Sequence, residues 1–410
     1  MDKPTHRRRF AAISVLMGAA AFLVVAGIVY SPGDAFRASL SGLQIWWQNV
    51  FPGLLPPLML ADLLAASGLL HGLATLAEPL TRGLFRLPGT SGWAIAFGWS
   101  AGIPAGAKEA ARLKERGMLQ DGDVDTVLLV SHLPNPFLVI LVIGCGFLHS
   151  AALGWSIALG LWLSAILSGM LWARIAKPRS PKLPSSPVRE PRALLRRAFR
   201  AAADARHDDG RPFGKQLADS VSHTIATLMA IGGLMMMSAV VIRLITYWIP
   251  GSDLWIALPG LYEMHLGAYE SSRSELFEAA PVYAAALLSA ALAWSGWSGL
   301  LQARAAFGAA SKFPWARVIA GRLLHGATAL LITYPIALAA TSKPVADFMY
   351  TLWPNRWPAL DAWASSAPWP NGWQRIPDTL AVAFVSFGIF ILLALTAALI
   401  RPKRPRERDE

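Results

Sequence analysis

Residues Phe97 to Lys108 read FGWSAGIPAGAK, a run of small residues with one proline and a terminal lysine inside otherwise apolar sequence. Glycine and proline interrupt the backbone hydrogen bonds of a helix. At the depth of a bilayer, backbone groups freed in this way are tolerated only where protein or a water-filled cavity satisfies them. This stretch therefore predicts a re-entrant hairpin or a broken helix that lines a substrate site.

A second stretch, Ala293 to Arg304 (AWSGWSGLLQAR), repeats the theme, because Gly98-Trp99-Ser100 recurs as Gly296-Trp297-Ser298. The two copies are 198 residues apart (297 minus 99), which indicates a domain duplication. Interrupted segments in corresponding halves are the best sequence indication of a secondary transporter's binding site. We expect an all-α polytopic membrane protein with two inverted repeats, each with a broken or re-entrant helical hairpin, plus amphipathic interfacial helices.

The composition indicates a membrane protein. Of the 410 residues, 54% are hydrophobic and 15% are charged, and the mean hydropathy is +0.43. Soluble domains are less apolar and more charged. The net charge of +12 comes from Lys and Arg gathered at the ends and in one central loop, as in the cytoplasmic flanks of membrane helices, which argues against nucleic-acid binding.

Sequence motifs give no sign of catalysis. The sequence has no HExxH, Walker A, GxSxG or Cys/His cluster, and its one cysteine, Cys145, excludes an intramolecular disulfide. We therefore expect neither an enzyme nor a bound metal or cofactor. A coupling ion, Na⁺ or H⁺, stays open, and so does assembly into a homo-oligomer.

The chain divides into six predicted parts. These are an N-terminal membrane anchor (1–38), a first transport repeat (39–176), a basic cytoplasmic linker (177–215), a second transport repeat (216–342), a Trp/Pro-rich interfacial segment (343–375), and a last transmembrane helix with a basic tail (376–410). Basic residues before the anchor place the N-terminus in the cytoplasm. The linker has too little apolar content to fold by itself.

Two segments of the first repeat read as amphipathic. Ser39 to Pro52 carries Trp46 and Trp47, side chains that settle at a membrane–water boundary, and we expect it to lie along the outer surface. His71 to Gly89 has a similar pattern. Both are expected to contact the lipid bilayer.

The apolar run Val124 to Leu148 is interrupted at Leu133-Pro-Asn-Pro136, where two prolines disfavour a helix. This break turns the carboxamide of Asn135 toward a polar environment. The overall topology contains a conflict: inverted repeats place the C-terminus outside, whereas the basic tail after Arg401 indicates the cytoplasm. A full crossing by Pro281 to Leu301, in place of a hairpin, would reconcile the two.

Several separated motifs carry a family resemblance over roughly residues 39–340. They are GLQIWWQNVFPGLLPP (42–57), AEPLTRGLFRLPG (77–89), GWSAGIPAGAK (98–108), SHLPNPF (131–137), LPGLYEMHLG (258–267) and GRLLH (321–325). Together they resemble the sporulation integral membrane proteins of the nucleoside-recognition (Gate) superfamily, and most closely its spore-stage V dipicolinate transporters.

The resemblance implies a fold similar to a protomer of the concentrative nucleoside transporters, and the export of dipicolinic acid from the mother cell during endospore formation. The corresponding location is a multi-pass position in the cell membrane, in the mother-cell-derived membrane around the forespore. The family's motifs map onto Gly98, Ser100, Gly102, Pro104, Gly106, Asn135, Pro136, Glu263 and Gly267. The sequence departs from the family pattern at His132, Leu133, Pro134 and His265.

The residue chemistry suits an anionic substrate. Half-helix N-termini at the breaks present N–H groups and a positive dipole end to a carboxylate. Lys108 and Arg304 end the two interrupted segments, where contact with substrate and snorkelling to the interface are both open. Arg243 and Arg322 bind substrate or pair with carboxylates such as Glu263 or Asp62.

The candidate residues form two groups. Candidates for substrate binding are Gly98, Ser100, Gly102, Pro104, Lys108, Asn135, Glu263, Ser295, Ser298, Gln302 and Arg304. Candidates for charge or proton coupling are His132, Arg243, His265, Arg322 and His325. A nucleoside carrier and a non-transporting scaffold in spore-envelope assembly stay as alternatives. The scaffold leaves the duplicated breaks unexplained.

Overall fold

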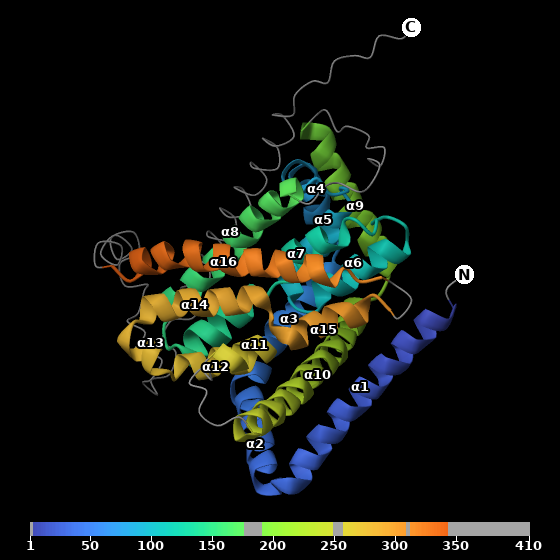
Figure 1. The fold of residues 1–410 in the computed structure, drawn as a ribbon. Helices are drawn as coiled ribbons and strands as arrows, with labels where there is room; N and C mark the ends of the chain where they lie inside the picture. Colours follow the sequence, from blue (N-terminus) through green and yellow to red (C-terminus); the bar gives the residue numbers. More distant parts are fainter. Residues whose placement is uncertain (1–2, 176–190, 249–256, 309–311, 343–410) are drawn as a thin grey trace.

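The computed structural model describes residues 3–175, 191–248, 257–308 and 312–342, and every regular element in these ranges is a helix (Figure 1). The first half holds α1 (Lys3–Tyr30), α2 (Pro32–Ile45), the π-helix η1 (Trp46–Val50), α3 (Phe51–Ala66), α4 (Leu69–Leu84), α5 (Ser91–Ala101), α6 (Ala105–Glu115), α7 (Val124–Ser131), the π-helix η2 (Leu138–Phe147) and α8 (Ala151–Ile175). The second half holds α9 (Pro191–Asp209), α10 (Phe213–Trp248), α11 (Ala257–Tyr262), α12 (Met264–Ser272), α13 (Glu275–Ala279), α14 (Pro281–Trp294), α15 (Gly296–Ala306) and α16 (Trp315–Ala340).

Five stretches within the described ranges are long and apolar enough to cross a membrane. They are Pro32–Ala66, Ala151–Ile175, Phe213–Tyr247, Pro281–Ala306 and Trp315–Ala340. The predicted all-α polytopic membrane class is therefore confirmed. The predicted Trp/Pro-rich segment (343–375) and the last helix with its tail (376–410) lie outside the described residues.

The helices α8, α14 and α16 pack closely together. Gly160 of α8 lies so close to Thr333 of α16 that any side chain at position 160 would overlap the threonine hydroxyl. Thr333 in turn donates from Oγ1 to Ser289 Oγ of α14 at 2.8 Å. Small and hydroxyl-bearing residues at these contacts let the helix backbones approach closely, as in other membrane helix bundles. The bundle forms the support on which the broken segments rest.

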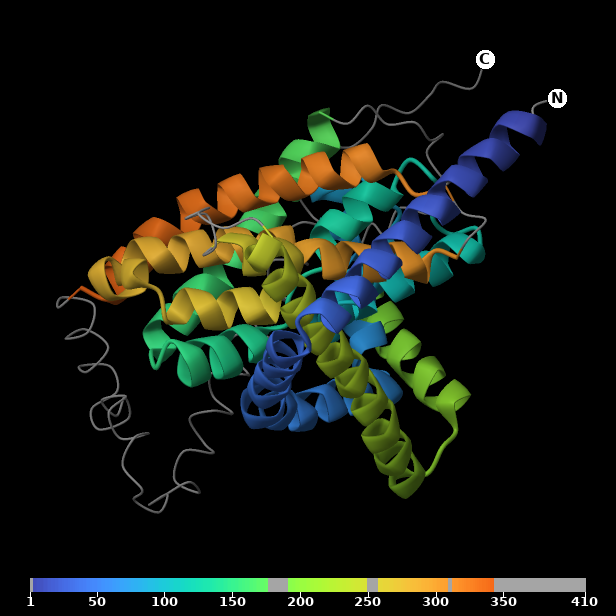
Figure 2. The same cartoon turned by 60° about the horizontal axis from the view of Figure 1, so that its bottom comes forward.

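The α1 helix runs along the outer edge of the molecule (Figures 1 and 2). Its apolar stretch Ser14–Tyr30 exposes large side chains such as Val15 and Phe22. It packs only lightly, against α2 and α10. Apolar side chains left without protein contacts are what a helix presents to lipid, so α1 has the character expected of the predicted anchor.

The expectation that residues 39–52 lie along the membrane surface is wrong for Trp46. This segment belongs to the continuous helical run Pro32–Ala66, and the side chain of Trp46 is 3% exposed. Its indole N–H donates to the Leu228 carbonyl of α10 at 2.9 Å, and Gly232 leaves room for the ring. A satisfied indole N–H removes the need for interfacial water. Trp47 remains largely exposed.

Part of the predicted linker 177–215 is the helix α9, which packs against α4. Leu194 and Ala198 of α9 are buried, and Gly68, before α4, lies directly against the Ala202 carbonyl. An ion pair of 3.0 Å joins Arg197 to Glu78. The segment folds because α4 supplies the apolar partner that its own sequence lacks.

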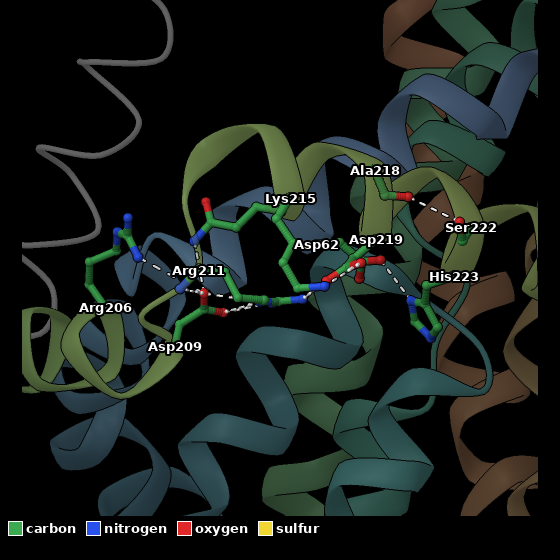
Figure 3. A network of polar contacts seen from close by, with 10 residues as sticks. Asp62, Arg206, Asp209, Arg211, Lys215, Ala218, Asp219, Ser222 and His223 are labelled. Carbon is green, nitrogen blue, oxygen red and sulfur yellow. Dashed lines mark hydrogen bonds and ion pairs between the residues drawn. The ribbon is translucent and has the colours of Figure 1, made fainter.

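The turn from α9 to α10 is held by a cluster of ion pairs (Figure 3). Arg211 donates to Asp209 at 2.6 Å and to Asp219 at 2.8 Å. Hydrogen bonds from Arg211 and Gln216 lower the pKa of Asp209, and the two aspartates raise the pKa of Arg211. These contacts fix the point at which α9 turns into α10.

Candidate functional site

The opening motif forms a helical hairpin. Helix α5 ends at Ala101, Gly102 adopts a φ of +83°, and α6 begins at Ala105 and packs back against α5. The left-handed conformation at Gly102 is one that glycine adopts without strain. The predicted interruption in a helix at this stretch is confirmed.

The two arms of the hairpin meet at glycines that enclose a carbonyl of α7. A side chain at Gly98 or at Gly106 would overlap the Ser131 carbonyl oxygen, and the two glycines also lie against each other. Trp99 adds a bond from its indole N–H to the Val130 carbonyl at 2.7 Å. The hairpin is therefore locked onto the end of α7, and the role of Gly98 is close packing.

Asn135 connects the two breaks of the first half. Its Nδ2 donates to the Ala101 carbonyl at 3.2 Å, and its Oδ1 accepts from the Leu138 N–H at 2.7 Å. The side chain thus satisfies a C-terminal carbonyl of α5 and an N-terminal amide at the start of η2. Its carboxamide bonds helix ends, which is the polar environment that the Leu-Pro-Asn-Pro break predicts.

The second interrupted segment has a different shape. Helix α14 ends at Trp294, Ser295 and Gly296 have φ values of +70° and +69°, and α15 then begins. Figures 1 and 2 show α15 continuing in the general direction of α14, while α16 runs back along α14. The expected second hairpin is therefore a broken crossing, in agreement with the alternative of a full crossing by residues 281–301.

The repeated Gly-Trp-Ser is not structurally equivalent in the two copies. Residues 98–100 lie in the last turn of α5, before the break, whereas residues 296–298 form the first turn of α15, after it. The first copy is followed by Gly102-Ile-Pro104, which ends the helix. The second copy is followed by Gly299-Leu-Leu, which allows the helix to continue.

The two interrupted segments meet inside the molecule. His132, at the end of α7, lies with Nε2 at 3.0 Å from the Gly299 carbonyl of α15, and α6 packs against α15. A small pocket lies at this junction. It is lined by Ile103, Ile231, Leu234, Glu263, Met264, His265, Ser298, Gly299 and Gln302.

Glu263 and His265 supply the charged part of the pocket lining. Glu263 caps α12, since its Oε2 accepts from the Leu266 N–H at 2.8 Å, and its Oε1 lies 2.6 Å from Nδ1 of His265. The side chains are 4% and 3% exposed. The start of α12 also contacts the second break, because a Cβ at Gly296 would come within 2.8 Å of the Tyr262 carbonyl oxygen.

Arg322 binds carbonyls at the ends of two helices. Its guanidinium is fully buried and donates to the carbonyls of Leu128, His132 and Ala293 at 2.8, 2.6 and 3.3 Å. These carbonyls belong to the C-terminal ends of α7 and α14, where the helix dipole is negative. The expected pairing of Arg322 with a carboxylate is therefore replaced by pairing with both helix ends.

The other expected ion pairs are also corrected. Arg243 lies 3.2 Å from Asp34, and Asp62 lies 2.7 Å from His223. Glu263 pairs with His265. Glu263 and Asp62 therefore pair with histidines, whereas Arg243 pairs with a carboxylate as expected, but with Asp34 instead of Glu263 or Asp62.

Among the predicted substrate-binding residues, Glu263, Ser298 and Gln302 line the pocket, together with His265 from the coupling group. Ser100 donates to the Ala96 carbonyl of its own helix at 2.8 Å. Lys108 is exposed on α6, and Arg304 donates to the Gly308 carbonyl at 2.6 Å. His325 is fully buried, with Nε2 at 3.2 Å from the Leu161 carbonyl.

Several buried polar atoms near the junction have no hydrogen-bond partner within the described residues. They include Ser295 Oγ, His132 Nδ1 and Arg322 Nε. Ser295 therefore remains a candidate although it does not line the pocket. The sequence reading did not single out the apolar lining of Ile103, Ile231, Leu234 and Met264, because an apolar residue in an apolar helix carries no distinguishing signal.

No group of three or more His, Cys, Asp or Glu side chains that could hold a metal ion lies within the described ranges.

Comparison with known proteins gives one informative relative. The chain is 32% identical over 235 residues to the sporulation integral membrane protein YlbJ of Bacillus subtilis strain 168, and the match covers 57% of each chain. The chain thus spans somewhat over half the length of that relative. No family model matches the sequence. No solved structure matches it either.

Proposed function

From a multi-pass membrane chain with a sporulation membrane protein as a relative, we propose a transporter that binds a small anionic substrate where the two interrupted segments meet. The observation that carries this proposal is the pocket. Its lining comes from the first break (Ile103), from the second (Ser298 and Gln302) and from the start of α12. Broken helices meeting at one polar pocket are the arrangement that secondary transporters use to bind substrate.

The helix ends at the junction favour an anion. Ser298 and Gly299 lie in the first turns of α15, so the positive end of this helix contributes to the pocket, whereas the positive end of α12 is capped by Glu263. Arg322 binds carbonyls of the negative ends of α7 and α14. This pairing leaves less negative potential to oppose an anion.

The substrate that we propose is dipicolinic acid, moved out of the mother cell by alternating access during endospore formation. The family resemblance supports this choice of substrate, and the name of the relative supports a role in sporulation. The site accordingly lies in the mother-cell-derived membrane, with the N-terminus in the cytoplasm. Apolar side chains beside polar ones, here Ile231 and Leu234 beside Gln302, suit an aromatic ring with carboxylates.

A nucleoside-like substrate is the second candidate, and one observation favours it. Glu263, Ser298 and Gln302 bring a carboxylate, a hydroxyl and a carboxamide to the pocket. These groups match the hydroxyl and amide groups of a ribose and a base. Neither Lys108 nor Arg304 lines the pocket, so an anion there would rely on helix ends and neutral donors.

The deciding experiment is uptake of labelled dipicolinate and labelled uridine by the purified protein in liposomes. We expect saturable dipicolinate uptake that a Ser298→Leu variant, which fills the pocket, reduces at least tenfold. Ser222→Leu is the matched control, because Ser222 is exposed on α10 and bonds only the Ala218 carbonyl of its own helix. Saturable uridine uptake without dipicolinate uptake would establish the second candidate. A scaffold predicts no uptake of either, and normal spore formation with Ser298→Leu.

A further inference from the structure

The pocket is lined by a buried carboxylate–imidazole pair, Glu263 and His265, which makes one more interaction than capping of helix α12 requires. One oxygen of Glu263 caps α12 by accepting from the Leu266 N–H, and the other lies 2.6 Å from His265 Nδ1. Both side chains are almost fully buried and both line the pocket. Capping needs only one oxygen, so the second interaction places a titratable group beside the substrate site.

This pair determines the charge of the pocket. The other lining residues are uncharged, and His132, whose Nε2 lies 3.0 Å from the carbonyl of the lining residue Gly299, does not itself line the pocket. Arg322 binds backbone carbonyls, and Arg243 pairs with Asp34 outside the pocket. The helices packed against α12 also carry titratable groups, and none of these lines the pocket: Asp34, Arg37, Cys145, Lys215, Asp219, His223, Arg243, Tyr247, Tyr262, Glu275, Glu278, Tyr283 and Arg304.

We propose that the Glu263–His265 pair takes up one proton with each substrate molecule, so that transport is coupled to a proton gradient. This inference rests on the proposed transport of an anion. With a neutral imidazole the pair carries one negative charge, which repels an anion across a desolvated pocket. One proton, delivered from water on the loading side, converts the pair to imidazolium and carboxylate with no net charge. The same proton returns to water on the other side when the substrate leaves.

The location of Glu263 brings the site of protonation into contact with the second interrupted segment. A Cβ at Gly296 would lie 3.2 Å from the Glu263 amide nitrogen. The start of α15 therefore contacts Glu263, whose electrostatic environment changes when His265 takes up the proton. Protonation of the imidazole strengthens its bond to Oε1 and draws charge away from the α12 cap. The pair is therefore placed to connect substrate charge with the packing of α12 against α15.

The test measures labelled dipicolinate uptake and internal pH, with a trapped fluorescent pH indicator, in the same liposomes. Lowering the external pH from 7.5 to 6.5 should raise initial uptake severalfold, and addition of dipicolinate should acidify the interior. In Glu263→Gln and in His265→Gln the ratio of uptake at the two pH values should fall to about one, whatever the absolute rate. His223→Gln is the matched control, since its pair with Asp62 has a similar 2.7 Å distance but an exposed histidine outside the pocket (Figure 3).

The outcomes separate the two proposals. Dipicolinate uptake by the unmodified protein without any internal acidification would overturn proton coupling and leave the transporter in place. Uptake of neither dipicolinate nor uridine would overturn the transporter and the coupling with it. A pH ratio that persists in both pocket variants would also overturn the assignment to this pair. The measurement on the unmodified protein holds even if a variant fails to fold.

Discussion

The two interrupted segments share a sequence signature but not a shape. In the first, α5 and α6 fold back on each other around the Ser131 carbonyl. In the second, α14 passes through two residues of positive φ into α15, which packs on α6, α11 and α12. One segment is a hairpin and the other a broken crossing, so a shared tripeptide does not determine the direction in which the chain leaves a break.

The two segments differ in shape because of the residue that stands eight positions after the glycine of each Gly-Trp-Ser tripeptide. Gly98 and Gly106 approach each other because neither has a side chain. At the repeat offset, Gly106 corresponds to Arg304, which could not approach Gly296 so closely. A hairpin needs small residues on both arms. A Gly-Trp-Ser tripeptide therefore predicts a hairpin only when a second glycine follows eight residues after its first residue, as Gly106 follows Gly98.

The largest effect is expected at Arg322, which binds the ends of both segments. Arg322→Met leaves the carbonyls of Leu128, His132 and Ala293 buried without this donor, and should lower the free energy of unfolding by about 3–5 kcal/mol. Arg243→Met removes a surface pair and should cost about 0–1 kcal/mol. Thermal unfolding in detergent measures both. Equal losses would show that the two breaks do not depend on Arg322.

A smaller loss is expected where the first segment differs most from the second. Gly106→Ala places a methyl group against the Ser131 carbonyl and should destabilise the protein by about 1–3 kcal/mol. Gly83→Ala, in helix α4, is the control, because nothing lies within 4 Å of a Cβ at that position. Denaturant or thermal unfolding compares the two. A neutral Gly106→Ala would contradict the close packing of the hairpin.

The two serines of the repeated tripeptide should differ in function. Ser298 lines the pocket and Ser100 bonds its own helix. Ser298→Ala should raise the substrate concentration at half-maximal uptake about fivefold, the equivalent of losing a hydrogen bond of about 1 kcal/mol. Ser100→Ala should leave it unchanged. The reverse order would place the substrate at the first segment.

The smallest effect is expected at the turn that joins α9 to α10. The lowered pKa of Asp209 means that its carboxylate stabilises the fold above the ordinary aspartate pKa of about 3.9, and that this contribution is lost as the pH falls toward the folded value. The unfolding midpoints of the unmodified protein and Asp209→Asn should therefore differ at pH 7 and converge at acidic pH. Asp204→Asn, on the exposed side of α9, is the control.

The sequence was sufficient for features with a local cause. Gly102, Pro104 and the two prolines around Asn135 interrupt helices wherever they occur, and the long apolar runs predict the crossings. Ser298 and Gln302 were predicted because polar groups at breaks in apolar sequence need a polar environment, and Glu263 because it matches the acidic motif of the family that the sequence resembles. Their meeting in one pocket fits the predicted convergence of the two segments.

Features with a distant cause were not predictable. Trp46 is buried because Gly232 and the Leu228 carbonyl receive it from a helix almost two hundred residues away. Helix α9 depends on α4, and the partners of Arg322 are backbone carbonyls, which every residue possesses and no motif reveals. The two Gly-Trp-Ser tripeptides were expected to be structurally equivalent and are not. The reason is related, since packing determines on which side of the tripeptide the helix breaks.

The Ser131 carbonyl, enclosed by Gly98 and Gly106, has a consequence for movement. A contact without side chains has no flexible atoms to adjust, so sliding α7 along the hairpin would drive backbone into backbone. Helices α5, α6 and α7 must then travel as a single rigid block. Any opening of the pocket has to occur on its other walls, which α10, α12 and α15 supply with side chains that can change rotamer.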